Sequence, residues 1–579
     1  MTADLVIRHG TIVDGSGAPA YESDIAIENG LIAEIGPSLG RGRQEIDAEG
    51  ALVTPGFIDP HTHYDGQATW DPVLAPSSIH GVTTVVMGNC GVGFAPVAPD
   101  RHDWLIETME GVEDIPGTAL HEGLRWNWES FPEYLDALAA QPRTIDVATH
   151  LPHVALRGYV MGEDGANPDA HPDQAGREEM VRLLHEALAA GAVGVSTSRT
   201  NRHMTKAGHP LGTLRTEEPE LFALAEGLRT AGRGVLQFVS DLYQTTDDDF
   251  AERESELLRG LVRATGRPAS FTVQQDDAAP HRWQEMLDLA SAMAQEGLAV
   301  RTQVAPRPIG VLLGLEASAN VFSPTRTWGR LAGLDADERL RALHDPEVRT
   351  RIIESHRAIT EGPDAFGGLA FFARFDDMYL LDSPANYDFT PEDSLGARAK
   401  RSGVDPRELA YDLQLASGGT QLIYRPLFNF SDHSLDVVHQ MVTHPLAMFG
   451  LSDAGAHCGQ ICDGSTPTSF LTLWARDRHH SPAGDGLPVE TVVHHLTQGV
   501  ARHFGWTDRG LLAPGLRADL NVLDLEALAC RAPKMVHDLP AGGGRLLQEA
   551  DGYRMTLKNG VATFVNGEST GALPGGLIR

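Results

Sequence analysis

Two histidines separated by a single residue, His61 and His63, carry the clearest chemical signal in the 579-residue sequence. They follow the apolar segment 57–58, which predicts a short buried strand. Alternate residues of an extended strand point to the same face, so both imidazoles can reach one point. Neutral imidazole is a common ligand of zinc and related metals. Two unrelated loop histidines are the alternative, because the chain has 25, but the strand end and the nearby Asp65 favour a metal site.

Apolar segments along the middle of the chain predict the strands that would position these histidines. The eight segments are 57–58, 83–91, 146–150, 193–198, 234–240, 269–275, 299–304 and 449–453. Helical patterns precede several of them, so we predict an α/β fold, a (β/α)8 TIM barrel over residues 56–500. About 140 residues separate the last two strands, which is more than one helix needs. We therefore expect a long helical insertion between strands seven and eight, at about 328–442, that acts as a lid over the barrel mouth.

Both ends of the chain predict β-structure. Asn29-Gly30 separates two runs of alternating polar and apolar residues near the N-terminus, and Asn559-Gly560 does the same near the C-terminus. An Asn-Gly pair between such runs is the strongest short-range signal for a hairpin. We predict that residues 1–55 and 501–579 together form a small β-sandwich domain beside the barrel.

Polar residues at the strand ends indicate the chemistry, because active sites of such barrels lie at the carboxyl ends of the strands. His61 and His63 end the first strand, Cys90 ends the second, and Asp453 ends the last. Two imidazoles, a thiolate and a carboxylate suit zinc. A metal-activated water would then be the nucleophile, with Asp453 as general base and later as the acid for a leaving amine. The alternatives are a small buried hydrophobic residue for Cys90 and a helix N-cap for Asp453.

Six stretches of the chain resemble the amidohydrolase superfamily, and more closely its D-aminoacylase (N-acyl-D-amino-acid deacylase) branch. They are 54–65, 81–91, 152–157, 191–197, 450–453 and 514–524, of which Asn89-Cys90-Gly91 is the most specific marker. The resemblance implies that Cys90 is a zinc ligand, working with histidines that end strands five and six. It also implies a second, weaker metal position at the His-x-His pair and Asp453, and Asp453 as general base.

Strands five and six depart from this pattern. The segments 236–241 and 272–277, where these strands end, contain no histidine. The lysine that helps the branch to bind the substrate carboxylate is absent too, and no lysine at any strand end could form a carboxylated-lysine bridge. Our hypothesis is therefore one zinc ion per chain, with the metal ligands His61, His63, Cys90 and Asp453.

Five further residues are candidates for binding substrate. His150, Gln274 and His457 lie at or just after strand ends, where they could contact substrate or complete the metal site. Arg199 follows strand four and Arg307 follows strand seven. A guanidinium fork suits a substrate carboxylate, so either arginine could replace the missing lysine. Ordinary surface arginines are the alternative.

Composition excludes several classes of partner. Lys+Arg is 46 against Asp+Glu 79, a formal net charge of -33, which argues against nucleic acid and anionic membranes. Four cysteines in this length do not form a disulfide framework. The first residues lack the features of a signal peptide, and no run of about 18 apolar residues predicts a membrane span. We expect a cytoplasmic protein; the oligomeric state is open, with a homo-oligomer as one alternative.

The predicted function is the metal-dependent hydrolysis of a linear amide, with a small-molecule N-acyl amino acid or related amide as substrate. An N-acyl-D-amino-acid deacylase is the simplest form, and its preference for D-substrates follows from the resemblance alone. The alternatives are a cyclic amide hydrolase, a lactonase or a deaminase of the same superfamily. A catalytically idle barrel that only binds ligands is the alternative outside enzymes.

Overall fold

Parallel strands that follow one another in chain order form the centre of the computed structural model, which describes residues 2–361, 367–480 and 484–579. One sheet contains β6 (Phe57–Asp59), β7 (Val82–Met87) and β8 (Asp146–Thr149). A second contains, in spatial order, β17 (Ala447–Phe449), β13 (Val300–Val304), β12 (Ala269–Thr272), β11 (Val235–Ser240), β10 (Gly194–Arg199) and β9 (Leu151–Pro152). Only His150 separates β8 from β9. The segments after β6 and β17 also meet, where Thr62 bridges Ala454.

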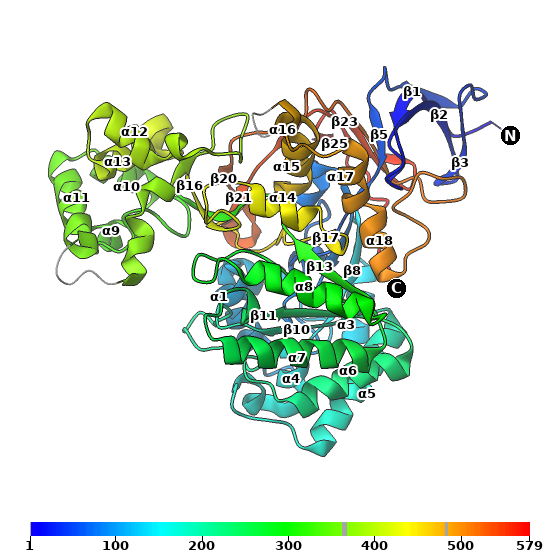
Figure 1. The fold of residues 1–579 in the computed structure, drawn as a ribbon, viewed down its shortest axis with the longest axis horizontal. Helices are drawn as coiled ribbons and strands as arrows, with labels where there is room; N and C mark the ends of the chain where they lie inside the picture. Colours follow the sequence, from blue (N-terminus) through cyan, green and yellow to red (C-terminus); the bar gives the residue numbers. More distant parts are fainter. Residues whose placement is uncertain (1, 362–366, 481–483) are drawn as a thin grey trace.

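Long amphipathic helices cover these strands in Figure 1. They are α5 (Gln174–Ala190), α6 (Glu218–Ala231), α7 (Asp248–Thr265) and α8 (Arg282–Gln295). The side chain of Asp173 caps the first turn of α5 by accepting a hydrogen bond from Gly176 N at 2.8 Å. On the inner face of this helix, Leu184 and Leu188 are fully buried. The polar outer face and the apolar inner face thus orient each helix against the strands.

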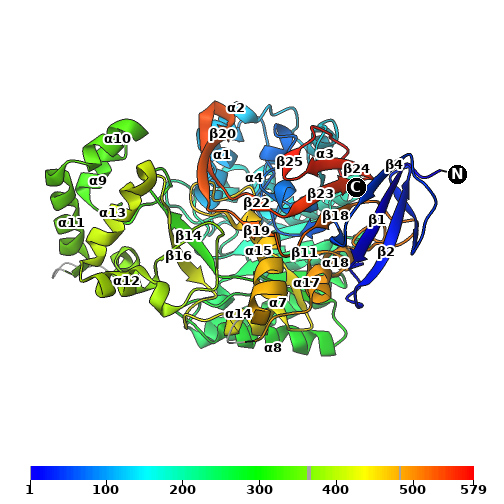
Figure 2. The same ribbon diagram turned by 90° about the horizontal axis from the view of Figure 1, so that it is seen from above.

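A helical region projects to one side of the parallel strands (Figures 1 and 2). It contains α9 (Arg326–Leu331), α10 (Ala336–Leu343), α11 (Pro346–Glu361), α12 (Leu395–Ser402) and α13 (Pro406–Gly419). Its base is a sheet in which β16 (Ile423–Phe428) pairs with β14 (Ile309–Leu313) and β15 (Tyr379–Leu380). The region has its own hydrophobic core around Trp328, Ile352 and Tyr411. Of the expected insertion, residues 362–366 lie outside the described residues.

Strands from both ends of the chain join in one sheet, seen at the right of Figure 2. The strands are β1 (Leu5–Ile12), β2 (Tyr21–Glu28), β3 (Leu31–Gly36), β4 (Gln44–Asp47), β5 (Leu52–Pro55), β18 (Leu520–Leu523), β23 (Tyr553–Lys558), β24 (Val561–Val565) and β25 (Glu568–Ser569). β5 and β18 pair antiparallel and connect the two halves. Asn29 and Gly30 have φ of 52° and 78°, and Asn559 and Gly560 have φ of 51° and 73°. Positive φ at both residues is what a two-residue hairpin turn requires.

A buried group of charges joins this terminal sheet to the parallel strands. Lys558 Nζ on β23 lies 2.6 Å from Asp146 Oδ2 on β8 and 2.6 Å from Asp519 Oδ2. Arg509 Nη1 also donates to Asp146 Oδ2, at 2.7 Å. Burial alone would raise the pKa of Asp146, but the charges of Lys558 and Arg509 hold it below its usual value.

None of the described helices combines the length and the apolar character needed to cross a lipid bilayer.

Candidate active site

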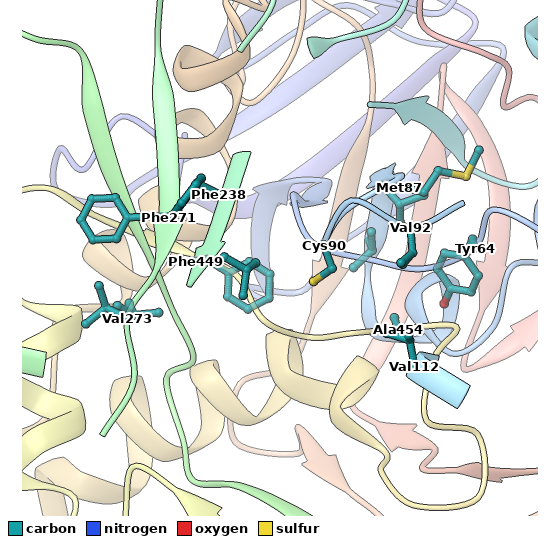
Figure 3. Close-up of a cluster of buried hydrophobic side chains, with 14 of the residues drawn as sticks. Tyr64, Met87, Cys90, Val92, Val112, Phe238, Phe271, Val273, Phe449 and Ala454 are labelled. Atoms are coloured by element: carbon teal, nitrogen blue, oxygen red, sulfur yellow. The ribbon is translucent and has the colours of Figure 1, made fainter. Parts of the chain in front are cut away.

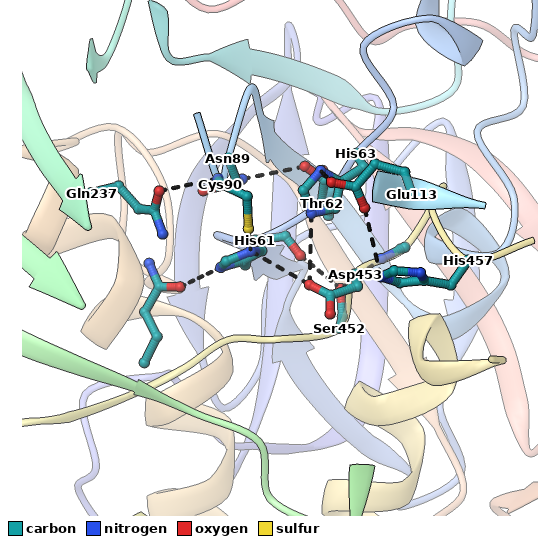
Figure 4. Close-up of polar contacts among 12 residues, drawn as sticks. His61, Thr62, His63, Asn89, Cys90, Glu113, Gln237, Ser452, Asp453 and His457 are labelled. Carbon is teal, nitrogen blue, oxygen red and sulfur yellow. Dashed lines mark hydrogen bonds and ion pairs between the residues drawn. The ribbon is translucent and has the colours of Figure 1, made fainter. Parts of the chain in front are cut away.

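Four side chains from three strand ends converge at the carboxyl end of the parallel strands (Figure 4). His61 Nε2 lies 3.2 Å from Cys90 Sγ and 3.4 Å from Asp453 Oδ1. His63 Nε2 lies 3.7 Å from the same oxygen of Asp453. His61, His63 and Cys90 are buried, whereas Asp453 keeps 21% of its side chain exposed. The structure thus brings together all four of the predicted metal ligands.

Tight left-handed turns place Cys90 and Asp453 at this point. Cys90 has a φ of 56° and Asp453 a φ of 47°, a region that costs a non-glycine residue about 1–3 kcal/mol. Gly88, two residues before Cys90, has a φ of 73°, and a Cβ there would stand 2.5 Å from the carbonyl oxygen of His150. Asn89 Nδ2 holds the turn by donating to Val86 O at 2.9 Å. In the motif Gly88-Asn89-Cys90, the first two residues therefore allow and hold the turn, and the third supplies the thiol.

Three pairs of donor atoms lie at about the spacing of ligands around a tetrahedral metal. With zinc at its usual distances from nitrogen, oxygen and sulfur, ligand atoms stand about 3.3–3.6 Å apart. The three measured separations range from 3.2 to 3.7 Å. Within the described residues, His61, His63 and Cys90 form the one cluster of metal-ligand type whose donor atoms all lie within 4.8 Å of one another. Asp453 Oδ1 is buried without a hydrogen-bond partner, so this set fits a metal ion with Asp453 as a further ligand.

Groups behind the two imidazoles set their orientation. His61 Nδ1 lies 2.6 Å from Gln303 Oε1, and Gln303 Nε2 in turn donates to Ser270 Oγ at 3.0 Å. Glu113, the last residue of α1 (His102–Glu113), places Oε1 3.3 Å from His63 Nδ1. Its other oxygen is 3.6 Å from His457 Nε2, so the carboxyl lies between two histidines (Figure 4). Each imidazole of the pair can therefore direct Nε2 to a metal while Nδ1 faces protein.

Burial dominates the electrostatics of this corner. It raises the pKa of the Cys90 thiol and of the Glu113 carboxyl well above their usual values, and it lowers the pKa of His63 to about 4. Burial would also raise the pKa of Asp453, but the nearby imidazoles of His63 and His61 hold it below its usual range. Cys90 belongs to a buried cluster with Phe238, Phe271 and Phe449 (Figure 3).

β11 and the segment after β12 contribute amides instead of histidines. Gln237 Oε1 accepts a hydrogen bond from Cys90 N at 3.1 Å, while Gln237 Nε2 is buried without a partner. Gln274, after β12, lines the cavity that opens beside the four converging side chains. These neutral side chains cannot replace imidazole as strong zinc ligands.

The cavity beside the metal-ligand cluster has a volume of about 250 Å³. His61, Cys90, Asp453 and His457 line one side. The rest of the wall comes from α1, from the loop after β10, from the ends of β11 and β12, from the base of the helical region and from the segment after β17. These residues are Val112, Thr200, Arg202, His203, Val239, Tyr243, Thr272, Gln274, Ile309, Gly310, Val311, Leu427, Phe428, Leu451, Gln460 and Ile461. A small organic molecule would therefore contact the cluster on one side and mostly apolar groups on the other.

Three predicted substrate-binding residues, His150, Arg199 and Arg307, do not line this cavity, whereas Gln274 and His457 do. Arg199 Nε donates to Glu254 Oε1 at 2.9 Å. Arg307 is fully buried, lies 3.8 Å from the ring centre of Tyr387, and binds Asp463 Oδ1 at 2.7 Å. The ring of His150 is 6.0 Å from that of Phe504, and burial lowers its pKa to about 3.

Four residues at or near the site were not among the predicted site residues: Glu113, Gln303, His203 and Arg202. Gln303 is the second-last residue of β13, and the in-and-out alternation of that strand could have identified it. Arg202 and His203 lie in the loop after β10, a few residues beyond the strand end. His203 Nδ1 is 2.8 Å from Ser198 Oγ, and burial lowers the pKa of His203 to about 3. Glu113 ends a helix, and no sequence pattern marks its position.

Known proteins resemble this chain along almost its whole length. The sequence model of the amidohydrolase family matches residues 44–564. The N-acyl-D-aspartate deacylase of Alcaligenes xylosoxydans xylosoxydans is 37% identical over 581 residues, which cover 98% of this chain and 93% of that protein. The chain belongs to the amidohydrolase family. This amidohydrolase is a hydrolase of carbon–nitrogen bonds other than peptide bonds.

Solved structures of two amidohydrolases have a similar fold. The N-acyl-D-glutamate deacylase of Bordetella bronchiseptica, solved with zinc and a phosphonate inhibitor, is 26% identical, with a TM-score of 0.63 and coverage of 100% of each chain. A D-aminoacylase is 23% identical, with a TM-score of 0.64 and coverage of 100% of this chain and 99% of the other. The second likeness concerns the fold alone.

Proposed function

We propose that this amidohydrolase removes the acyl group from N-acyl-D-amino acids, with one zinc ion per chain held by His61, His63, Cys90 and Asp453. The observation that carries the proposal is a cluster of donor atoms at metal spacing beside a cavity for a small molecule. The 37% identity to an N-acyl-D-aspartate deacylase supports the reaction class, and the zinc in the N-acyl-D-glutamate deacylase supports the metal.

We also propose that the parallel strands from β6 to β17 form a (β/α)8 barrel. Their pairing order follows the chain, and the bridge between Thr62 and Ala454 brings the first and last segments together. In such a barrel the residues after each strand surround one mouth. This arrangement explains how side chains almost 400 residues apart in the sequence, His61 and Asp453, can share one site.

The side chains have distinct tasks in the proposed reaction. A zinc ion, when bound, supplies Lewis acidity toward an amide carbonyl and lowers the pKa of water. Asp453, through the carboxylate oxygen that does not face His61 and His63, accepts the proton from the attacking water and delivers it to the leaving nitrogen. The carbon–nitrogen bond breaks, a carbon–oxygen bond forms, and the products are a carboxylate and an amine. The apolar residues of the cavity wall exclude other water molecules.

Metal analysis combined with a substrate screen tests the proposal. Protein purified without added metal should contain about one zinc per chain, and it should release amine from N-acyl-D-amino acids faster than from their L-enantiomers. Release of ammonia from a nucleobase, or opening of a cyclic amide or lactone without amine release, would assign the chain to another amidohydrolase reaction. Absence of metal, with no activity after zinc is added, would contradict the proposal.

A further inference from the structure

Beyond the metal-ligand cluster, the described residues of the cavity lining are mostly apolar or neutral polar, with one permanent cation among them. The apolar residues include Val239, Tyr243, Ile309, Val311, Leu427 and Phe428. Among the described residues that line the cavity, Arg202 is the one guanidinium, and no lysine lines it. Burial keeps the pKa of His203 near 3, so this neighbour is uncharged at neutral pH. A substrate that fills the cavity therefore meets a single permanent positive charge away from the cluster.

The guanidinium of Arg202 is held in place with donors to spare. Arg202 Nε donates to Gln244 Oε1 at 2.6 Å, and Nη2 donates to Asp276 Oδ2 at 2.9 Å. Its central carbon lies 5.6 Å from the centre of the Phe428 ring. Within the described residues Nη1 has no partner. Nη1 and the second hydrogen of Nη2 can donate from the same edge of the planar guanidinium group. Two donors on one edge can bind both oxygens of a carboxylate through parallel hydrogen bonds.

The distance across the cavity suits a small N-acyl amino acid. A volume of about 250 Å³ corresponds to a sphere about 8 Å across, slightly below the usual range of about 300–1,000 Å³ for small-molecule sites. In an N-acyl amino acid, three bonds separate the acyl carbon from the α-carboxylate carbon. One such molecule can therefore present its amide to the metal-ligand cluster and its α-carboxylate to a cation elsewhere in the same cavity lining.

Asp276 limits what the site can accept. Its carboxylate is buried beside Arg202, so the pair together carries no net charge. One substrate carboxylate can use the free donors of Arg202. A second carboxylate, on an aspartate or glutamate side chain, would find no second guanidinium or ammonium among the described residues that line the cavity, which is costly for a charged group.

We propose that Arg202 binds the α-carboxylate of the substrate, and that the cavity selects N-acyl-D-amino acids with an apolar side chain over N-acyl-D-aspartate and N-acyl-D-glutamate. This inference rests on the proposed deacylase function. It also separates this chain from its relative that carries the name N-acyl-D-aspartate deacylase, despite 37% identity.

Arg202→Gln and a matched control, Arg374→Gln, test the anchor in zinc-loaded protein. Both side chains are 51% exposed. Arg202 pairs with Asp276 at 2.9 Å, and Arg374 pairs with the adjacent Asp277 at 3.0 Å and also with Asp377 at 2.6 Å. Only Arg202 lines the cavity. With N-acetyl-D-leucine, Arg202→Gln should raise KM by about tenfold or more with a much smaller change in kcat. Arg374→Gln should leave both constants unchanged, and Arg202→Lys should recover part of the loss.

The choice among substrates provides the second test. The wild-type protein should have a kcat/KM for N-acetyl-D-leucine at least about tenfold above that for N-acetyl-D-aspartate and N-acetyl-D-glutamate. A preference for either acidic substrate, or an unchanged KM in Arg202→Gln, would overturn the inference while the deacylase function stands.

Calorimetry measures the binding of the substrate carboxylate by Arg202 separately from turnover. Wild-type protein should bind N-acetyl-D-leucine more tightly than N-acetyl-D-leucinamide, which lacks the carboxylate, and Arg202→Gln should lose that difference. Equal binding of the two compounds by the wild-type protein would overturn the anchor. If zinc-loaded protein hydrolyses no N-acyl amino acid, the deacylase function fails, and the binding difference still decides whether Arg202 recognises a carboxylate.

Discussion

Two buried polar clusters in this molecule are built in opposite ways. In the cluster between β8 and β23, Lys558 and Arg509 meet the carboxylate of Asp146 at 2.6 and 2.7 Å, and Lys558 meets Asp519 as well. At the mouth of the parallel strands, Asp453 Oδ1 is buried without a hydrogen-bond partner. Buried polar groups are normally paired, so the first cluster is complete in the protein alone and the second is complete only with a ligand.

The comparison extends to the backbone. Lys558 and Asp146 stand on regular strands, whereas Cys90 and Asp453 stand in left-handed turns just beyond strand ends. A strained backbone persists only where the surrounding structure holds it, as Asn89 and Gly88 do around Cys90. We therefore expect changes in the first cluster to alter stability and changes in the second to alter metal binding and turnover.

Removing an imidazole from the second cluster should have the largest effect on function. His61→Ala and His63→Ala should each abolish metal retention and lower turnover by about a thousandfold or more, because Lewis acidity at the amide carbonyl is lost. The free energy of unfolding should change little by comparison. Elemental analysis and amine release measure the two effects. His121→Ala, an exposed histidine outside the site, is the control, and variants that keep the metal would refute the ligand assignment.

Removing the ammonium from the first cluster should have the largest effect on stability. Lys558→Met leaves Asp519 and Asp146 with one cation fewer in a buried place, which should lower the free energy of unfolding by about 3–5 kcal/mol. Metal content of the folded protein should stay the same. Urea unfolding measures the change, with Lys534→Met, a half-exposed lysine paired to Glu549, as control. Equal stability of the two variants would contradict the contrast between the clusters.

A smaller effect is expected from the carboxyl behind His63. Glu113→Gln should weaken zinc binding by about 10–100-fold, because an amide is a poorer acceptor for His63 Nδ1 than a carboxylate. Competition with a chromogenic chelator measures the affinity. Glu110→Gln on the same helix, whose carboxylate pairs with Lys206 at 2.6 Å, is the matched control. Unchanged affinity in Glu113→Gln would show that Glu113 does not support the ligand.

Lowering the pH should reduce the free energy of unfolding through Asp146 in the first cluster. This is the smallest of the expected effects. The folded-state pKa of Asp146 lies below its ordinary value of 3.8, so its contribution to stability is complete above that value and disappears as pH falls through the folded-state pKa. Unfolding free energy should therefore decrease in that acid range. Lys558→Met should flatten this decrease, since the charge that lowers the pKa of Asp146 is reduced. Parallel curves for wild type and variant would argue against the role of Asp146.

Local patterns in the sequence predicted part of this structure because short-range physics decides those parts. The Asn-Gly pairs at 29–30 and 559–560 form hairpin turns with positive φ at both residues. The apolar segments became parallel strands within a few residues, although 449–453 is strand only at its first residue, because Leu451 and Asp453 adopt left-handed φ. The family and the class of reaction also followed from motifs in the sequence.

By itself, the sequence determined which strand ends carry metal-binding side chains, because a strand directs alternate residues to one face whatever its neighbours are. The tertiary structure decided which other groups face them. Glu113 contacts His63 from a helix, and Arg202 lines the cavity from a loop. Arg307 forms an ion pair with Asp463. Those pairings join residues with no fixed spacing in the chain, since they depend on how separate elements pack, and packing is not encoded in any short motif.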